Sequence, residues 1–440
     1  MSLNSKTLFV SSLLLFGFGC KEDSIPMNPE SDPPNILVII ADDMGWDAFG
    51  NYPGTNGVKA KTPVIDSLAQ VGVTFYNFWV NPTCSPTRAN LLTGKYSFRT
   101  AIGSALGGNS VGLKSSEILL QQYIANQSPN NYASALIGKW HLGSSVGLTA
   151  PEQFGIGYFS GIFQGTVADY YNWTRTSNGI QTQVTNYATS YFVDQSISWI
   201  QKQDQPWFLW LAFNAPHTPF HLPPIGLISN KSLPVDQASI NSNRLIYYLA
   251  AIEAMDTEIG RLFSSFTEEE RRKTIVIFLG DNGTGVQVAQ LPYSSTKSKE
   301  SLFQGGINVP LIISGASNSR KNEIDLSLVN GTDLYATIAA FSGVEVSAIN
   351  DSYSLIPLLK GEGSFPRKIA YSEQFGSDLP SEGWAIRNQR YKLIQLNNGV
   401  SYLFDLISDP FENIDLLAKP LTTEELQAVQ ELRLEKEKLN

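Results

Sequence analysis

The chain of 440 residues is 42% hydrophobic and 16% charged, which is typical of a globular protein with a large core and not of a disordered one. Its formal net charge of -9 provides no general positive field, which argues against nucleic acid as a partner. An anionic substrate is still compatible with this charge if a few cations converge in one pocket. The chain has two cysteines and three histidines, so each of them can be considered individually.

The first residues have the pattern of a secretory signal peptide. Lys6 precedes an apolar stretch at residues 8–18, which is too short to span a membrane. Small residues then precede Cys20, which resembles the processing site of bacterial lipoproteins, where the cysteine is lipidated. The residues after it, Lys-Glu-Asp, resemble the export tag of surface lipoproteins in Bacteroidetes-type bacteria. Cleavage and secretion without a lipid is the alternative.

We therefore expect a signal peptide at residues 1–20 and a tether at residues 21–34, which is rich in Pro, Asp, Ser and Asn. The mature protein would be an outer-membrane or cell-surface lipoprotein, with a periplasmic or secreted protein as the alternative. Lipidation of Cys20 would leave Cys84 without a disulfide partner. A solitary thiol in an oxidising compartment is a liability unless it is buried or chemically converted.

Residues 35–40 form a continuous apolar run that is rich in β-branched side chains, which predicts a strand buried on both faces of a parallel sheet. The run ends at Asp42 and Asp43. Functional sites of open α/β sheets lie beyond the carboxyl ends of the strands. Two adjacent carboxylates repel each other there unless a cation lies between them. The alternative is that one caps a helix and the other is solvated.

A helix is predicted at residues 62–72, with Pro at its first position and Gly at its end. Farther along, Pro86 is suitably placed to start a second helix that runs through Leu92. Cys84 would then lie at the N-terminus of that helix, where free backbone N–H groups favour an anion. The alternative for Cys84 is a small, buried hydrophobic residue.

Two further buried strands are predicted at residues 133–137 and 206–213. Each leads into a segment that contains histidine, and a lone lysine or histidine in such a place is usually a surface residue. The polar residues that follow the two strands are Lys139, His141, His217 and His221. Lys139 and His141 would point to the same side of an extended segment.

A fourth strand, at residues 274–279, ends at Asp281 and Asn282. Lys299 follows, ahead of another strand at residues 311–314. Because the carboxyl ends of parallel strands meet at one edge of the sheet, we expect the polar residues after them to form one site. The oxygen donors there are Asp42, Asp43, Asp281 and Asn282. A set of oxygen donors without Cys or His suits Ca²⁺ or Mg²⁺ and not zinc.

The succession of elements predicts an α/β fold with a central, mostly parallel sheet flanked by helices, such as one at residues 245–263, in a catalytic domain at residues 35–365. Residues 366–440 read as a small C-terminal subdomain with an antiparallel sheet and a helix. The helix is expected at residues 422–439, with Leu426, Val429 and Leu432 on its inward face.

Several motifs resemble those of one family. Residues 84–88 read C-x-P-x-R, with Thr-Gly five positions later, which resembles the signature of the type I, formylglycine-dependent sulfatases of the alkaline phosphatase superfamily. Further matching segments occur in the family's order at residues 62–72, 138–143 and 216–219, and from Lys299 to residue 310. Gln304 and Asn308 depart from the usual Glu and Arg, at positions without a chemical role in the family. The resemblance covers residues 35 to about 417.

The resemblance implies that Cys84 is oxidised to formylglycine (3-oxoalanine), and that one hydroxyl of the aldehyde hydrate attacks the sulfur atom of a sulfate ester. The other hydroxyl then loses a proton, sulfate leaves by C–O cleavage, and the aldehyde is regenerated. Arg88 would keep the nucleophile ionised. The implied ligands of a Ca²⁺ ion, with Mg²⁺ as the alternative, are Asp42, Asp43, Cys84, Asp281 and Asn282.

The same resemblance assigns the other polar residues. His141 would take the proton from the second hydroxyl. Lys139 and Lys299 would bind the sulfate oxygens, and His217 with Lys299 would assist the leaving alcohol. His221 lies outside the shared pattern, and we expect it to line the substrate pocket.

These implications predict a sulfuric ester hydrolase that removes sulfate from a sulfated polysaccharide or oligosaccharide. Its expected partners are that glycan and a formylglycine-generating maturation enzyme, with membrane contact through the N-terminal lipid alone and no nucleic acid. One alternative is a phosphonate monoester hydrolase or phosphodiesterase, since relatives with the C-x-P-x-R motif have these activities. Another is a non-catalytic, glycan-binding surface lipoprotein.

Overall fold

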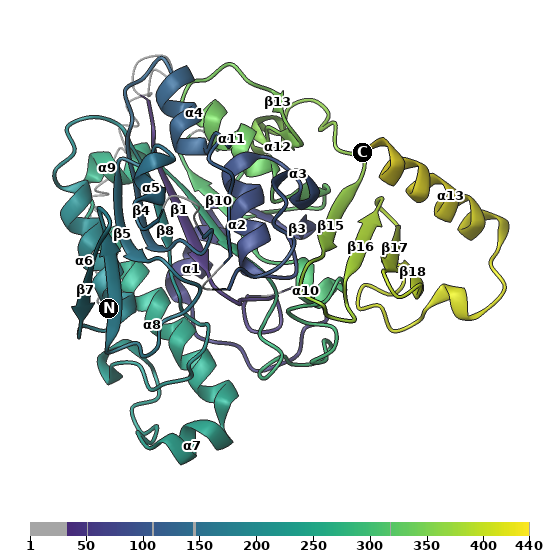
Figure 1. Ribbon diagram of the computed structural model, residues 1–440, viewed down its shortest axis with the longest axis horizontal. Coiled ribbons are helices and arrows are strands. Elements are labelled where there is room, and N and C mark those ends of the chain that lie inside the picture. Colours follow the sequence, from purple (N-terminus) through teal and green to yellow (C-terminus); the bar gives the residue numbers. More distant parts are fainter. Residues whose placement is uncertain (1–32, 51, 108–109, 144–146, 317, 440) are drawn as a thin grey trace, which may run out of the picture. The chain divides into compact units, whose positions relative to one another are not determined.

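The computed structural model describes residues 33–440, apart from positions 51, 108–109, 144–146, 317 and 440 (Figure 1). The predicted signal peptide, Cys20 and nearly all of the predicted tether lie outside the described residues. The part of the chain from Pro33 onward forms one compact unit. Within the described ranges, no helix is both long enough and apolar enough to cross a membrane.

A ten-stranded sheet forms the centre of the molecule, in the order β11-β2-β10-β9-β1-β8-β4-β5-β6-β7. Its five central strands pair in parallel and consist almost entirely of buried residues. They are β9 (Thr274–Gly280), β1 (Asn35–Ala41), β8 (Trp207–Ala212), β4 (Ala133–Lys139) and β5 (Tyr158–Ile162). The four runs that predicted buried strands thus all lie in this parallel part.

Both edges of the sheet contain antiparallel pairs, so the sheet is mixed. β10 (Leu311–Gly315) runs antiparallel to β9 and to β2 (Gly72–Phe75), while β11 (Glu323–Asp325) is parallel to β2. At the other edge, β6 (Trp173–Ser177) is antiparallel to β5 and to β7 (Ile180–Val184). The expected α/β fold is confirmed, with parallel pairing at the centre and mostly antiparallel pairing at the edges.

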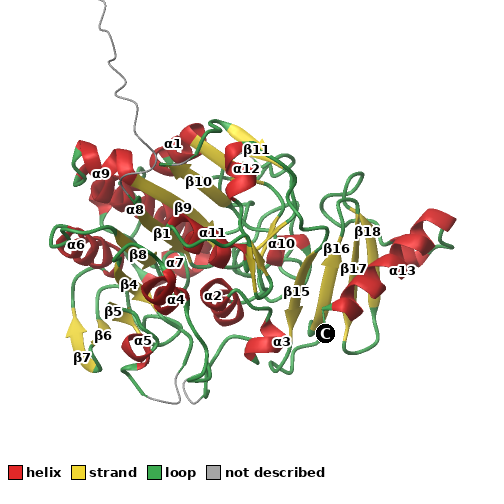
Figure 2. Ribbon diagram, turned by 90° about the horizontal axis from the view of Figure 1, so that it is seen from above, coloured by secondary structure: helices red, strands yellow, loops and turns green. Residues whose placement is uncertain are grey.

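Helices cover both faces of the sheet, as Figure 2 shows. Along β1, Leu37 and Ile39 face one hydrophobic core, and Ile36 and Val38 face the other, as the two-residue period of a strand requires. The first core includes residues of α1 (Pro63–Val71), α6 (Ala188–Ile200) and α8 (Arg244–Ser264). The second includes residues of α2 (Cys84–Thr93), α4 (Leu120–Gln127) and α11 (Asp333–Phe341).

The C-terminal segment forms a four-stranded antiparallel sheet and a helix, as predicted. The strands are β15 (Ala370–Gln374), β16 (Gly383–Arg387), β17 (Tyr391–Leu396) and β18 (Ser401–Asp405). Helix α13 (Thr423–Lys438) starts with a capping box between Thr422 and Glu425. The predicted inward face was wrong at Leu426, which is 50% exposed, whereas Ala428 and Leu432 are buried. The face that packs against this sheet is therefore rotated from the stripe that the sequence suggested.

The remaining elements are short and connect the larger ones. The short strands are β3 (Phe78–Trp79), β12 (Val329–Asn330), β13 (Ala348–Ile349) and β14 (Ser352–Tyr353). The short helices are α3 (Ser97–Thr100), α5 (Ala150–Gln153), η1 (Ile225–Leu227), α7 (Gln237–Ser242), α9 (Glu268–Lys273), α10 (Gln304–Ile307), α12 (Ile356–Lys360) and η2 (Leu416–Ala418).

Candidate active site and metal centre

The candidate site lies beyond the carboxyl ends of the central parallel strands. The registers of β1 with β9 and with β8 place Ala41 beside Gly280 and Ile40 beside Ala212. The backbone continues this alignment past the strand ends, because Asp281 N donates to Ala41 O over 3.1 Å. The residues that follow these strands therefore meet at one edge of the sheet, as expected.

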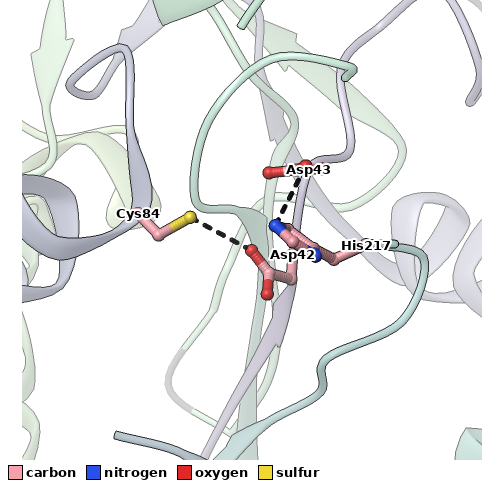
Figure 3. Close-up of side chains that lie close together, drawn as sticks. All are labelled: Asp42, Asp43, Cys84 and His217. Carbon is pink, nitrogen blue, oxygen red and sulfur yellow. Dashed lines mark hydrogen bonds and ion pairs between the residues drawn. The ribbon is translucent and has the colours of Figure 1, made fainter. Parts of the chain in front are cut away.

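Cys84 is the first residue of α2, two residues earlier than the predicted start at Pro86. Its side chain is 1% exposed, and Sγ lies 3.4 Å from Oδ1 of Asp42 (Figure 3). Ligand atoms of Asp42, Asp43, Cys84 and His217 all lie within 4.8 Å of one another. This group of side chains has the composition and spacing of a metal-binding centre.

Asp281 and Asn282 join this group through Asp43. The backbone N–H of Asp43 donates to Asp281 Oδ1 over 3.1 Å, and Asn282 Nδ2 donates to Asp43 Oδ1 over 2.8 Å. The buried Oδ1 atom of Asn282 has no hydrogen-bond partner among the described residues. A buried, unpaired amide oxygen beside carboxylates is suited to a hard cation. The residues present thus fit the oxygen-coordinated ion that the sequence predicted.

Three cationic side chains surround the carboxylates. Lys139 Nζ lies 2.6 Å from Asp42 Oδ2 and is fully buried. Arg88 Nη2 lies 2.7 Å from Asp281 Oδ2, and Arg88 Nη1 donates to the Lys139 carbonyl oxygen over 3.1 Å. Lys299 Nζ lies 2.7 Å from Asp43 Oδ1. The structure therefore brings together the predicted cations and the predicted metal ligands in one network.

Burial and neighbouring charges set the protonation of the network. Burial raises the pKa of Asp42, but the charges of Lys139, His217 and Arg88 outweigh it and hold the pKa well below its usual range. Burial and the charge of Asp42 raise the pKa of Asp281 to about 7. Burial and the Asp42 charge also raise the pKa of the Cys84 thiol to about 12. Unmodified Cys84 is consequently a thiol at neutral pH and a weak nucleophile.

His141 lies two residues beyond β4, in a left-handed backbone conformation with φ 55°. The expectation of an extended segment was therefore wrong at this residue. Ser85 Oγ donates to the His141 carbonyl over 2.8 Å, and His141 Nε2 lies 3.0 Å from the Leu106 carbonyl oxygen. A Cβ added to Gly165 would lie 2.4 Å from Nε2, so the imidazole is closely enclosed. Sequence reasoning missed Ser85 because it occupies a variable position of the C-x-P-x-R segment, and it missed Leu106 and Gly165 because they lie outside the recognised motifs.

The contacts of His141 determine its tautomer. A carbonyl oxygen can only accept, so Nε2 carries the proton and Nδ1 keeps its lone pair. Burial and the charges of Lys139 and Arg88 hold the pKa of His141 well below its ordinary value. The buried Nδ1 atom has no partner among the described residues. The imidazole is thus neutral and has a free acceptor atom.

A cavity of about 210 Å³ opens over Asp43 and is lined by His217, Lys299 and Glu300, among others. His217 Nδ1 lies 2.8 Å from the Thr218 carbonyl oxygen, and Nε2 lies 3.7 Å from Asp43 Oδ2. The imidazole therefore directs Nε2 toward the metal ligands and the cavity.

His221, which we expected to line the substrate pocket, does not line this cavity. It lines a neighbouring cavity of about 560 Å³, stacks on Tyr170 at 3.8 Å and lies 3.0 Å, through Nε2, from the Tyr187 hydroxyl. Tyr170 in turn donates to the His217 carbonyl over 2.8 Å. The two cavities share the side chain of Phe220. The side chain of Tyr170 therefore connects His221 to His217.

Thr284 and Tyr248 are further residues that sequence reasoning missed. Thr284 Oγ1 accepts from the Gly45 N–H over 3.1 Å, and Tyr248 donates to the Asp43 carbonyl over 2.7 Å. Both therefore fix the backbone around the two aspartates. Because both residues lie far from Asp43 in the sequence, no local pattern could predict these contacts.

Comparison with known proteins identifies the family. The family model described as Sulfatase matches residues 34–344. The chain belongs to the sulfatase family. A second model, described as N-sulphoglucosamine sulphohydrolase, C-terminal, matches residues 297–439 of this sulfatase. The resemblance carried by the C-x-P-x-R segment is thereby confirmed, and the protein is an enzyme that hydrolyses sulfuric esters.

Relatives cover the sulfatase almost from end to end. Arylsulfatase A of Bos taurus is 27% identical over 92% of this chain and 88% of its own length. Among solved structures, Ps i-CgsB in complex with k-i-k-neocarrahexaose has a TM-score of 0.76 at 24% identity and 92% coverage of both chains. BT4656, solved in complex with its substrate D-glucosamine-2-N,6-O-disulfate, has a TM-score of 0.73 at 20% identity and covers 93% of this chain and 98% of its own. These structures share the fold of this sulfatase.

Proposed function

We propose that this sulfatase removes sulfate from a sulfated carbohydrate, with formylglycine made from Cys84 as the nucleophile and Ca²⁺ as the bound ion. The observation that carries the proposal is the position of Cys84 Sγ, 3.4 Å from Asp42 Oδ1, among buried carboxylates and cations. Similarity in fold to proteins solved with k-i-k-neocarrahexaose and with D-glucosamine-2-N,6-O-disulfate supports a carbohydrate substrate.

The metal centre would use the oxygen atoms of the two strand ends. Asp42, Asp43, Asp281 and Asn282 would hold Ca²⁺ together with residue 84, with Mg²⁺ as the alternative. When bound, the ion would supply positive charge that stabilises the ionised nucleophile and the negative charge of the sulfate group. The unpaired Oδ1 atom of Asn282 supports this assignment, since no described residue satisfies it.

Burial and the charge of Asp42 raise the pKa of the Cys84 thiol to about 12, so an unmodified Cys84 would be a weak nucleophile toward a sulfate ester. As a formylglycine hydrate, residue 84 would supply one hydroxyl to attack the sulfur atom and a second to release sulfate by C–O cleavage. Arg88 keeps a fixed positive charge close to residue 84, because it is buried and paired with Asp281. That charge favours the ionised form of the attacking hydroxyl.

The two histidines near the network would move protons in opposite directions. His141 is neutral, and its Nδ1 atom is free to accept a proton from the second hydroxyl of residue 84. His217, with Nε2 directed to the cavity, would donate a proton to the leaving alcohol. Lys139 and Lys299 would stabilise the sulfate oxygens. Lys139 would stabilise the sulfate oxygens from a fully buried position beside Asp42.

His221 would contact a part of the carbohydrate that is farther from the sulfate group. It lines the neighbouring cavity together with Tyr171, an aromatic side chain that is 38% exposed. Aromatic and hydrogen-bonding side chains at the edge of a pocket are suited to a sugar ring. We assign His221 to substrate binding and not to the chemical step.

The organisation of the whole chain completes the proposal. Residues 35–365 would form the catalytic domain, and residues 366–440 the C-terminal subdomain. Signal-peptide cleavage and lipidation at Cys20 would place the enzyme on the outer membrane or cell surface, and a maturation enzyme would convert Cys84. The membrane contact would then be made by the lipid alone.

Sulfate release from a panel of defined sulfated oligosaccharides and aryl sulfates tests the proposal. Protein from a host that contains a maturation enzyme is compared with a C84A variant prepared in the same way. We expect release by the wild type alone. Faster cleavage of a matched aryl phosphodiester than of the aryl sulfate would instead indicate a phosphodiesterase, and carbohydrate binding without release would indicate a binding protein.

A further inference from the structure

Glu300 carries a free negative charge on the wall of the active-site cavity. It lines that cavity with Lys299, His217 and Gln287, and its side chain is exposed. Its carboxylate has no hydrogen bond or ion pair with any described residue. The other acidic residue of the lining is Asp43, which is bound to Lys299 and Asn282. Among the described residues of this wall, Glu300 is thus the acid that is free to interact with a substrate.

The backbone holds Glu300 in this position. It has φ 68°, a left-handed conformation that costs energy for a residue with a Cβ atom. A hydrogen bond of 2.9 Å from Glu300 N to the Pro82 carbonyl and one of 3.1 Å from Lys299 N to the Thr284 carbonyl hold the segment on both sides. Consecutive side chains of an extended segment point in opposite directions, whereas Lys299 and Glu300 line the same cavity.

We infer that Glu300 selects the charge of the sugar that carries the scissile sulfate. Sulfated carbohydrates often carry further sulfate or carboxylate groups, and a second anion on the same ring would lie close to the Glu300 carboxylate. Repulsion would disfavour that substrate, while an uncharged ring or one with a free amino group would be accepted. This inference rests on the proposed function, and it narrows the substrate class to rings with a single negative charge.

The test is a series of three aryl sulfates that differ in one para substituent, namely 4-carboxyphenyl, 4-carbamoylphenyl and 4-(aminomethyl)phenyl sulfate. The wild type is compared with E300Q, which keeps the size and the backbone conformation of the residue and removes its charge. For each enzyme, kcat/KM for a charged substrate is divided by kcat/KM for the neutral amide. Compared with the wild type, this ratio in E300Q should be about fivefold higher for the anionic substrate and about fivefold lower for the cationic one. The change should lie mainly in KM and shrink at high ionic strength.

E362Q serves as the matched control, because Glu362 is an exposed glutamate just after α12 and does not line the cavity. Its ratios among the three substrates should equal those of the wild type. Ratios in E300Q that equal those of the wild type would overturn the inference. If the three aryl sulfates are not hydrolysed, the same ratios are measured on sulfated oligosaccharides with and without a second anionic group. If protein whose Cys84 is shown to be converted releases sulfate from none of these substrates, the proposed function itself fails.

Discussion

The Cys84 thiol donates to Asp42 with 3.4 Å between Sγ and Oδ1, although 42 positions separate the two residues. The contact joins the first residue of α2 to the first residue after β1. Its consequence is chemical, because the buried thiol beside a carboxylate has a pKa of about 12 and stays protonated. The hydroxyl oxygens of a formylglycine hydrate would suit this position beside a cation better than sulfur does. The position of residue 84 therefore agrees with the proposed conversion of Cys84.

Replacement of Asn282 by alanine is expected to weaken the binding of Ca²⁺, because the variant loses the buried Oδ1 atom that no described residue satisfies. A ligand that binds only the folded protein stabilises it by about 2.7 kcal/mol when the ligand concentration is a hundred times Kd. At the Ca²⁺ concentration that stabilises the wild type in this way, N282A should lose most of the stabilisation. Urea unfolding in the presence of Ca²⁺ and of EGTA measures the difference in unfolding free energy.

The control for this experiment is N131A, because Asn131 is exposed and bonds to Gln205 through its side chain. Ca²⁺ should stabilise N131A as much as the wild type. Equal stabilisation of N282A and N131A would contradict the assignment of Asn282 as a ligand.

Ser85 is expected to position His141. Its hydroxyl donates to the His141 carbonyl and accepts from Leu106 N over 3.1 Å, and it is fully buried. S85A should lose about 1–3 kcal/mol of stability, because buried polar groups lose their partner. It should also lower kcat about tenfold with little change in KM, since the imidazole shifts relative to residue 84. Steady-state kinetics and urea unfolding provide the two readings.

S67A is a suitable comparison for S85A, because Ser67 is exposed and bonds locally to Val64 O within α1. It should behave as the wild type in both measurements. A stable S85A variant with wild-type kcat would remove Ser85 from the positioning of His141.

Much of the site could be predicted because its residues directly follow apolar runs. Asp42, Asp43, Asp281 and Asn282 come directly after runs that can hardly be anything but buried strands, and parallel pairing brings such ends together. The contacts around His141 could not be predicted in this way. Ser85 reaches His141 across 56 positions, and the left-handed backbone at His141 depends on packing that no local pattern encodes.

The edges of the fold were also beyond the sequence patterns. The apolar run at residues 311–314 predicts a strand. An apolar run is compatible with either strand direction, so the antiparallel pairing of β10 with β9 could not be predicted from it. In α13, positions 426, 429 and 432 form one stripe, yet the face in contact with the sheet is centred nearer Ala428 and Leu432. Tertiary contacts decide such a rotation when a helix has partly apolar residues on more than one face.

His221 is expected to make stability fall in mild acid. Burial lowers its pKa to about 4 from the ordinary 6.5, so the unfolded chain binds the proton more tightly than the folded protein. The contribution of neutral His221 is therefore complete above pH 6.5 and is lost as the pH falls toward 4. The ring is partly exposed, so we expect a change of about 1 kcal/mol between pH 7 and pH 5.

The difference in unfolding free energy between wild type and H221F isolates this effect, because all other titrating groups cancel. Relative to the wild type, the variant should gain about 1 kcal/mol on acidification from pH 7 to pH 5. A difference that does not vary with pH would contradict the lowered pKa of His221.

Arg367 is expected to be essential for stability. Its guanidinium is buried, lies 2.6 Å from Asp333 Oδ2 through Nε, and donates to the Tyr96 hydroxyl over 2.9 Å. R367M would leave the buried carboxylate of Asp333 without its cation, and should cost about 3–5 kcal/mol. Urea unfolding measures the loss.

R390M is the matched comparison, because Arg390 pairs with Asp405 and Glu424 while 42% of its side chain is exposed. Exposed pairs contribute below about 1 kcal/mol. Similar losses in the two variants would show that burial of the Arg367 pair has no particular effect.

The mass of the tryptic peptide that contains Cys84, residues 62–88, tests the central claim most directly. The protein is purified from its native host, and sulfate release is measured on the same sample. We predict that the peptide has the mass of the 3-oxoalanine form and reacts with a hydrazide, and that the converted fraction is proportional to the activity. Full activity in a sample whose Cys84 is entirely an unmodified thiol would contradict the account.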